Sequence, residues 1–273
     1  MNLLNIFNQI QETDPEIYER IDDRRAAMHR FKNIGGKLAL TAVPLALGGM
    51  LNKAYSAPPP SGITAILNFA LTLEYLEAEF YATAVALAGL INASEKSSFA
   101  MISQHETAHV AFLKTTITAL GDTPVDKPEF DFTAGGAFPT VFSDYQVFLA
   151  VSQTFEDTGV RAYKGQAGGL MSSNEVLTAA LQIHSVEARH ASHVRKIRRM
   201  TGADASEKPW ITGKSTNGIG SAVQASYNGE ENTMQLKIDI TTLDGATANA
   251  ATESFDEPLT MDEVLAIVGP FIK

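Results

Sequence analysis

The stretch Glu106-Thr-Ala-His109 recurs further along the chain as Glu187-Ala-Arg-His190. Residues three positions apart face the same side of a helix, so the carboxylate and the imidazole of each stretch can reach one metal ion together. A single Glu-x-x-His pair often arises by chance, whereas two pairs in long helical segments form a much more specific pattern. The two stretches therefore predict a metal site between helices.

Four long helices are expected around these stretches, because apolar residues recur there at helical spacing. Serines that can cap a helix and glycines that can end one mark most of the boundaries. The expected helices run from about Ile63 to Leu90, from an N-cap at Ser94 to Gly121, from near Ser143 to about Gly165, and from near Ser173 to Gly202.

The connection between the second and third helices, residues 121–142, is unusually long for a compact domain. A bundle whose second and third helices run in the same direction needs one such crossover along its length. The fold class predicted for the chain is therefore mainly α, a four-helix bundle with one long crossover between helices 2 and 3.

A metal site in such a bundle also requires one carboxylate from each of the other two helices. Glu74 and Glu156 meet this requirement, since each lies in the middle of an apolar helix. The two halves of the bundle repeat closely. Glu74 precedes Glu106 by 32 residues, and Glu156 precedes Glu187 by 31.

A tyrosine follows each of these lone glutamates by seven residues, at Tyr81 and Tyr163. Seven residues are about two helical turns, so each tyrosine lies on the same face as its glutamate. The repeat favours Glu74 as the ligand over Glu77 and Glu79. Those two carboxylates are expected near the site or in solvent, with Glu77 open as a substitute ligand.

The six-residue set resembles the dimetal site of the ferritin-like superfamily. Residues 67–81 (LNFALTLEYLEAEFY) and 255–259 (FDEPL) are similar to a narrower group, the bacterial ferritin-like proteins related to plant desiccation-associated proteins. The resemblance implies two bound ions, iron or manganese with zinc also open. It implies that the tyrosines are hydrogen-bonding or electron-donating groups beside the ligands. The implied ligands are Glu106 and Glu187 as bridges, Glu74 and Glu156 as terminal carboxylates, and His109 and His190 as terminal imidazoles.

Two classes of function follow from the resemblance. The first is a redox protein that reacts with oxygen or peroxide in oxidative or stress protection, either of ferroxidase or peroxidase type or of manganese-catalase type. The second is a non-catalytic metal-binding or structural protein in stress tolerance or assembly. Loss of metal without loss of function would favour the second.

Several residues near the ligands have less defined roles. His105, His184 and His193 are expected just outside the site or at the surface. A ligating imidazole needs a hydrogen-bond partner for its other nitrogen, and Asp157 is a candidate for that partner.

The chain divides into three parts, with residues 61–202 as the bundle. Residues 1–60 are expected to begin with a helix, and they contain the Arg24-Arg25 pair, an apolar run over 38–51 and small residues before three prolines. This order resembles a twin-arginine export signal, which predicts membrane association or a periplasmic location. A retained structural helix, and with it a cytoplasmic location, is the alternative.

Residues 203–273 form a C-terminal β/α extension, expected as a hairpin plus a short helix. The run Met234–Ile240 alternates apolar and polar residues, which is typical of a strand. Thr260 and Glu263 have the spacing of a capping box at the start of the last helix, and Pro270 is expected to end it.

Composition narrows the chemistry. The 273 residues include no cysteine, so disulfides, thiolate zinc sites and cysteine nucleophiles are excluded. The net charge of −10 argues against nucleic acid as a partner. The segments outside the bundle favour assembly, such as a homo-oligomer, and disfavour a ferritin-type hollow shell because they would obstruct its packing.

Overall fold

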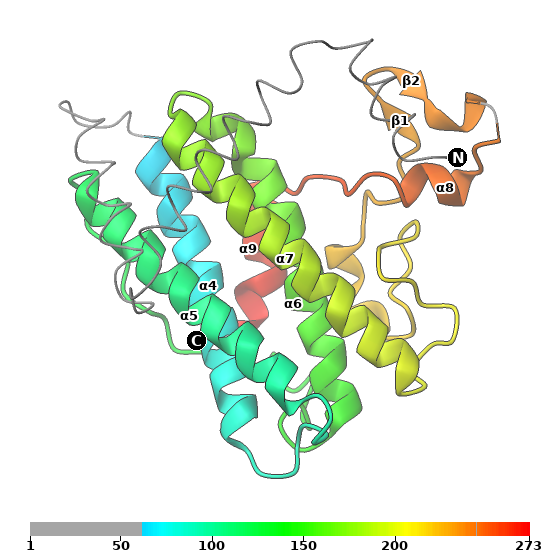
Figure 1. The fold of residues 1–273 in the computed structure, drawn as a ribbon, viewed down its shortest axis with the longest axis horizontal. Helices are drawn as coiled ribbons and strands as arrows, with labels where there is room; N and C mark the ends of the chain where they lie inside the picture. The colour runs from blue at the N-terminus through cyan, green and yellow to red at the C-terminus, as the bar shows by residue number, and fades with distance from the viewer. Residues whose placement is uncertain (1–61, 244) are drawn as a thin grey trace, which may run out of the picture. The chain divides into compact units, whose positions relative to one another are not determined.

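The computed structural model describes residues 62–243 and 245–273 (Figure 1). The predictions for residues 1–60, including the export signal, lie outside the described residues. Four long helices dominate the described part. They are α4 (Ile63–Ala86), α5 (Lys96–Ala119), α6 (Tyr145–Gln166) and α7 (Asn174–Met200).

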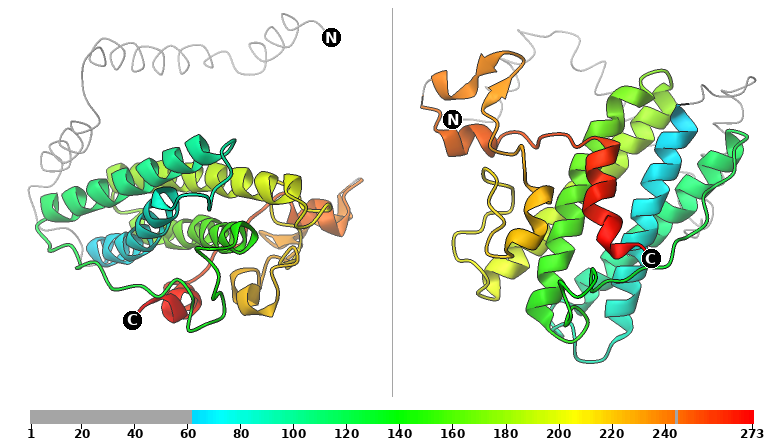
Figure 2. Two further views of the ribbon diagram at one scale, coloured as in Figure 1. Left: turned by 90° about the horizontal axis from the view of Figure 1, so that it is seen from below. Right: turned by 180° about the vertical axis from the view of Figure 1, so that it is seen from behind.

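The helices pair as the loop lengths predict. α4 packs mainly against α5, and α6 against α7. Figure 1 and Figure 2 show α5 and α6 running in the same direction, with residues 120–144 returning along the bundle between them. The four-helix bundle with one long crossover is confirmed.

The helix boundaries agree with the sequence except at two places. The first helix ends at Ala86, four residues before the predicted Leu90. The predicted cap at Ser94 is wrong, because α5 follows Glu95 and no side chain caps it. Ser173 does cap α7, accepting a hydrogen bond from the Val176 amide.

Shorter elements follow the bundle. They are η1 (Ala167–Leu170), η2 (Ser221–Ser226), β1 (Met234–Gln235), β2 (Ile238–Asp239), η3 (Ile240–Thr242), α8 (Ala248–Thr252), α9 (Met261–Val268) and η4 (Gly269–Phe271). The capping box of Thr260 and Glu263 forms at the start of α9. The C-terminal end lies beside the crossover, where Phe130 and Ile272 form an antiparallel bridge.

The strand-like run over 234–240, expected as part of a hairpin, forms a two-stranded hairpin by itself. Leu236 and Lys237 have positive φ angles of 48° and 69°, so the run folds back on itself as a tight hairpin. The alternation of apolar and polar residues in this run does not mark a buried face. Met234, Leu236 and Ile238 are all exposed.

α6 is buried around its whole circumference from Val151 to Tyr163, because α4 and α7 cover one side and the extension and α9 cover the other. Polar side chains therefore face inward on both sides. Glu156 faces the bundle interior, whereas Gln153, Asp157 and Arg161, spaced by four residues, form a stripe toward the extension.

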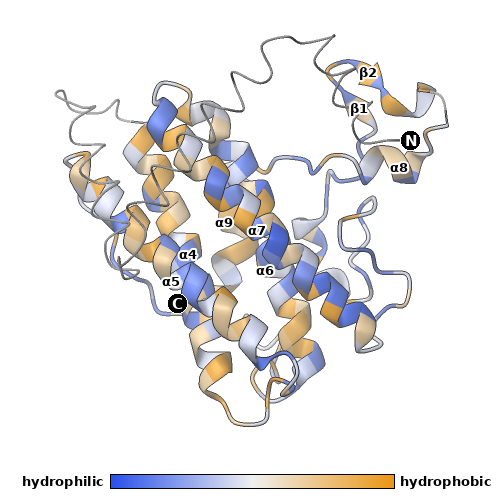
Figure 3. Ribbon diagram, in the orientation of Figure 1, coloured by the Kyte–Doolittle hydropathy of each residue, from blue (hydrophilic) through white to orange (hydrophobic). Residues whose placement is uncertain are grey.

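Hydropathy differs among the helices. Figure 3 shows mostly hydrophobic residues along α4 and a mixture of both kinds along α6 and α7. None of the helices within the described ranges is long and apolar enough to cross a membrane.

Two buried arginines of α7 bind the extension to the bundle. The Arg195 guanidinium donates to both carboxylate oxygens of Asp157, at 3.0 and 2.6 Å, and to the Asn217 side chain at 3.1 Å. Arg198 donates to Glu207 at 3.0 Å and to the Asn217 carbonyl at 3.2 Å.

Arg161 of α6 makes the matching attachment further along the extension. Its guanidinium donates to the carbonyls of Ser226, Asn228 and Glu257 at 2.5 to 2.8 Å and pairs with the buried Glu230 at 2.7 Å. Buried backbone carbonyls need donors, and this side chain supplies three. Residues 203–259 are thus held by hydrogen bonds and ion pairs as well as by apolar packing.

Gly165, near the end of α6, is a position where the extension leaves no room for a side chain. A Cβ atom there would lie 1.9 Å from the carbonyl oxygen of Leu259. Because backbone and not a flexible side chain is in the way, Gly165→Ala should lower the free energy of unfolding by about 3 kcal/mol. Urea denaturation measures this change.

Gly168→Ala, three residues on, is the matched control. A Cβ there meets nothing within 4 Å, so stability should change by no more than about 1 kcal/mol. Equal effects of the two substitutions would contradict the close approach of Leu259.

Candidate metal centre

The six predicted ligands come together midway along the bundle, and each of the four helices contributes. The four glutamates are fully buried, and His190 is 5% exposed. The His109 side chain, at 12%, is the most accessible of the six. The six residues are Glu74, Glu106, His109, Glu156, Glu187 and His190.

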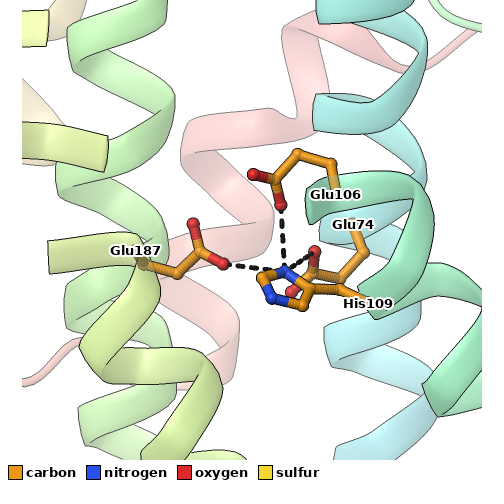
Figure 4. A group of neighbouring side chains, drawn as sticks. All are labelled: Glu74, Glu106, His109 and Glu187. Atoms are coloured by element: carbon orange, nitrogen blue, oxygen red, sulfur yellow. Dashed lines mark hydrogen bonds and ion pairs between the residues drawn. The ribbon is translucent and has the colours of Figure 1, made fainter. Parts of the chain in front are cut away.

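One half of the cluster surrounds His109. Its Nδ1 atom lies 3.1 Å from oxygens of three carboxylates, as Figure 4 shows. These carboxylates come from three different helices and belong to Glu74, Glu106 and Glu187. Their ligand atoms and the imidazole nitrogen all lie within 4.8 Å of one another, a spacing that can hold a metal ion.

The other half surrounds His190 in the same way. Its Nδ1 atom lies 2.9 Å from Glu106 and 3.4 Å from both Glu156 and Glu187. These four residues also have ligand atoms within 4.8 Å of one another.

Glu106 and Glu187 belong to both halves, and each divides its two oxygens between them. Glu106 presents Oε2 to His109 and Oε1 to His190. Glu187 presents Oε1 to His109 and Oε2 to His190. This is the arrangement of two carboxylates that can bridge a pair of ions.

Several of these buried atoms have no hydrogen bond within the described residues. They are Glu106 Oε1, Glu156 Oε2, both Glu187 carboxylate oxygens and His190 Nδ1. One imidazole nitrogen cannot satisfy three carboxylates, so buried acceptors remain, and leaving them unsatisfied is costly. A set of carboxylates and imidazoles suits iron, manganese or zinc. The residues present therefore fit a metal ion in each half.

Protonation reflects the crowding of charge. Burial, together with the neighbouring Glu187 charge, raises the pKa of Glu106 to about 8. Burial also raises the pKa of Glu156 to about 7. Although burial opposes it, the imidazoles of His109 and His190 lower the pKa of Glu187 to about 2.

The pKa values of the two imidazoles are raised, which favours their positively charged forms and offsets this negative charge. Burial works against their charged forms, but Glu74 chiefly raises the pKa of His109, and Glu156 chiefly raises that of His190. In the metal-free protein, protons on the imidazoles and carboxylates thus supply the positive charge that metal ions would otherwise bring.

The tyrosines cross between the two halves. The Tyr81 hydroxyl on α4 donates to Glu156 Oε1 on α6 at 2.5 Å, and the Tyr163 hydroxyl on α6 donates to Glu74 on α4. Each tyrosine lies two turns away from the ligand glutamate on its own helix. Its hydroxyl therefore bonds to the ligand glutamate of the other helix. Each hydroxyl thereby orients one carboxylate of the cluster.

Glu77 is a seventh carboxylate beside the cluster. It is 4% exposed, and a Cβ atom at Gly159 of α6 would lie 3.4 Å from its Oε1 atom and 3.9 Å from Cγ of Glu187. Burial, followed by the charge of Glu187, raises its pKa well above the usual range. Of the two places expected for Glu77, near the site or in solvent, the structure shows the place near the site. In the sequence, its spacing of three residues from Glu74 was the feature that indicated a place near the ligands.

The hypothesis that Asp157 anchors a ligand histidine is wrong. Its carboxylate accepts from Arg195 and from the Tyr227 hydroxyl, on the side of α6 away from the metal cluster. A histidine takes that place instead, since His105 Nδ1 lies 2.9 Å from His190 Nε2. His184 bonds to the Val160 carbonyl.

The comparisons with known proteins agree with this geometry. No curated protein matches the chain. The family model for a ferritin-like domain matches residues 62–200, which span all four bundle helices and all six ligand candidates. With a match over half of its length, the chain belongs to the ferritin-like domain family.

Proposed function

We propose that the chain is a dimetal-carboxylate protein that binds two iron or manganese ions and reacts with oxygen or peroxide in protection against oxidative damage. The observation that carries the proposal is the division of the Glu106 and Glu187 oxygens between two imidazoles. Glu74 and His109 would complete the first site. Glu156 and His190 would complete the second.

Charge supports this assignment. Four carboxylates balance the four positive charges of two divalent ions, so the loaded cluster is neutral, whereas four ionised carboxylates alone would be costly to bury. Iron or manganese would supply the change of oxidation state that oxygen or peroxide chemistry requires. The chain would supply the ligands, the hydroxyls of Tyr81 and Tyr163 that hold two carboxylates in place, and an interior shielded from water.

Metal content tests the binding half of the proposal. Wild-type protein loaded anaerobically with ferrous ion or manganese should hold about two ions per chain by elemental analysis. Glu106→Gln/Glu187→Gln keeps the side-chain volume but removes both bridging charges, so it should retain none. Glu79→Ala/Glu175→Ala removes two glutamates outside the cluster and should bind as wild type.

Exposure of the loaded protein to oxygen or hydrogen peroxide tests the redox half. Consumption of the oxidant by wild-type protein, and not by the Gln/Gln variant, is the expected result. Two bound ions with no consumption would leave the alternative, a structural or sequestering metal site. Absence of bound ions in folded wild-type protein would overturn both.

A further inference from the structure

The two nitrogens of His190 have different surroundings. Nδ1 faces the carboxylates of the cluster, whereas Nε2 lies 2.9 Å from Nδ1 of His105. The two rings lie edge to edge and nearly coplanar, with centroids 5.2 Å apart and planes inclined by 15°, as a hydrogen bond between ring nitrogens requires. His105 is on α5, one residue before Glu106, so its backbone is fixed by the same helix that carries a bridging ligand.

His109 has no comparable support. Its Nδ1 faces the carboxylates as that of His190 does, but its Nε2 has no hydrogen-bond partner within the part of the chain that the structure describes. The two halves of the cluster therefore have matching ligands but differ in the hydrogen-bond partner of the outer imidazole nitrogen.

A surface hollow of about 360 Å³ opens beside the His105–His190 pair, between α5 and α7. His105 and His190 both line it, as do Met101, Arg189 and His193. A small molecule from solvent can therefore approach the outer edge of this pair without crossing the bundle.

We propose that His105 is a positioning residue for the metal ion on the His190 side, an inference that rests on the proposed function. With its own proton on Nε2, His105 accepts at Nδ1 the hydrogen bond that the Nε2–H group of His190 donates. That bond selects the tautomer of His190 whose Nδ1 lone pair faces the cluster. It also holds the ring at the angle that the site requires.

The two metal positions are consequently unequal. The position that uses Glu156 and His190 depends on His105, and the position that uses Glu74 and His109 does not. Loss of an outer partner of a ligating histidine typically weakens metal binding by about 10–100-fold. His105→Ala should impose that loss on one ion of the two.

Titration with Co²⁺, followed by its visible absorption, can separate the positions. In a Glu74→Gln background only the His190-side ion should remain, and His105→Ala should weaken it by about 10–100-fold. In a Glu156→Gln background only the His109-side ion should remain, and the same substitution should leave its affinity unchanged. His193→Ala is the control, because His193 lines the same hollow but pairs with Glu95 and makes no hydrogen bond to His190 within the described residues.

Two kinds of rescue distinguish positioning from a general structural role. His105→Asn places an amide oxygen near the site of Nδ1 and should restore most of the affinity. Free imidazole should enter the enlarged hollow of His105→Ala and restore Co²⁺ binding, with no such gain for wild type or His193→Ala at the same imidazole concentration.

The outcomes separate this inference from the proposed function. Two ions bound by wild type and unchanged affinities in His105→Ala would overturn the role of His105 alone. Weakened binding that neither asparagine nor imidazole restores would do the same. Folded wild-type protein that binds no ion would remove the proposed function, and the inference with it.

Discussion

Asp157→Ala should lower the free energy of unfolding by about 3–5 kcal/mol, because it leaves the Arg195 guanidinium buried without its carboxylate. Arg195 is fully buried, and both Asp157 oxygens accept from it. The substitution also removes the acceptor of the Tyr227 hydroxyl. Since domains are typically stable by about 5–15 kcal/mol, this loss is a large fraction of the total.

Urea denaturation at neutral pH measures the effect, and limited proteolysis should show whether residues 203–259 detach first. Asp126→Ala, an exposed substitution in the crossover, should change stability by less than about 0.5 kcal/mol. A loss below 1 kcal/mol for Asp157→Ala would mean that Arg195 finds another partner. Folded Asp157→Ala protein should keep its metal content, because the Asp157 carboxylate pairs with Arg195 and Tyr227 on the side of α6 away from the cluster.

The fold and the six ligand candidates were predictable because they depend on spacing within helices. Two Glu-x-x-His pairs and two lone glutamates at matching offsets have to converge once four helices pack in the expected order. The crossing of Tyr81 and Tyr163 was not predictable to the same degree. Helical periodicity says which face a side chain lies on, but not which neighbouring helix it reaches.

The attachment of the extension shows the same limit. Gln153, Asp157 and Arg161 form a visible stripe on α6, yet a polar stripe ordinarily indicates a solvated face. The sequence does not say that residues 203–259 fold over it. The partner of His190 was missed for a related reason, since Asp157 and His105 are both near a ligand in sequence and only the packing decides between them.

Metal-free protein should lose stability as the pH rises from about 5 to 8. Burial chiefly raises the pKa of Glu106 to about 8 and that of Glu156 to about 7, so the folded state keeps protons that the unfolded state has released above about pH 4.5. The raised pKa values of His109 and His190 act in the same direction above about pH 6.5. Each such proton contributes about 1.4 kcal/mol per pH unit, so the loss over the range is comparable to the whole stability of a typical domain.

The lowered pKa of Glu187, about 2, has the opposite sign but acts elsewhere. Its stabilisation is present above about pH 4.5 and is lost only as the pH falls toward 2. The site as a whole should therefore favour the folded, metal-free protein most at mildly acidic pH, near 5.

Metal-loaded protein should behave differently, because bound ions take the place of the protons and their binding tightens as the pH rises. The difference in unfolding free energy between loaded and metal-free protein should grow from pH 5 to 8. Urea denaturation across that range measures it, and proton release on metal addition in weak buffer counts the protons displaced. Burial also raises the pKa values of Glu207 and Glu230, but they lie outside the cluster and cancel in the difference.

Glu106→Gln is the internal control for this linkage. It removes one proton-binding group from the cluster, so the stability of the metal-free variant should depend less steeply on pH than that of wild type. If metal-free wild-type protein instead became more stable from pH 5 to 8, protons would not be neutralising the buried carboxylates. The negative charge of the cluster would then have to be balanced in some other way. The explanation of the pH dependence by exchange of protons for metal ions would be wrong.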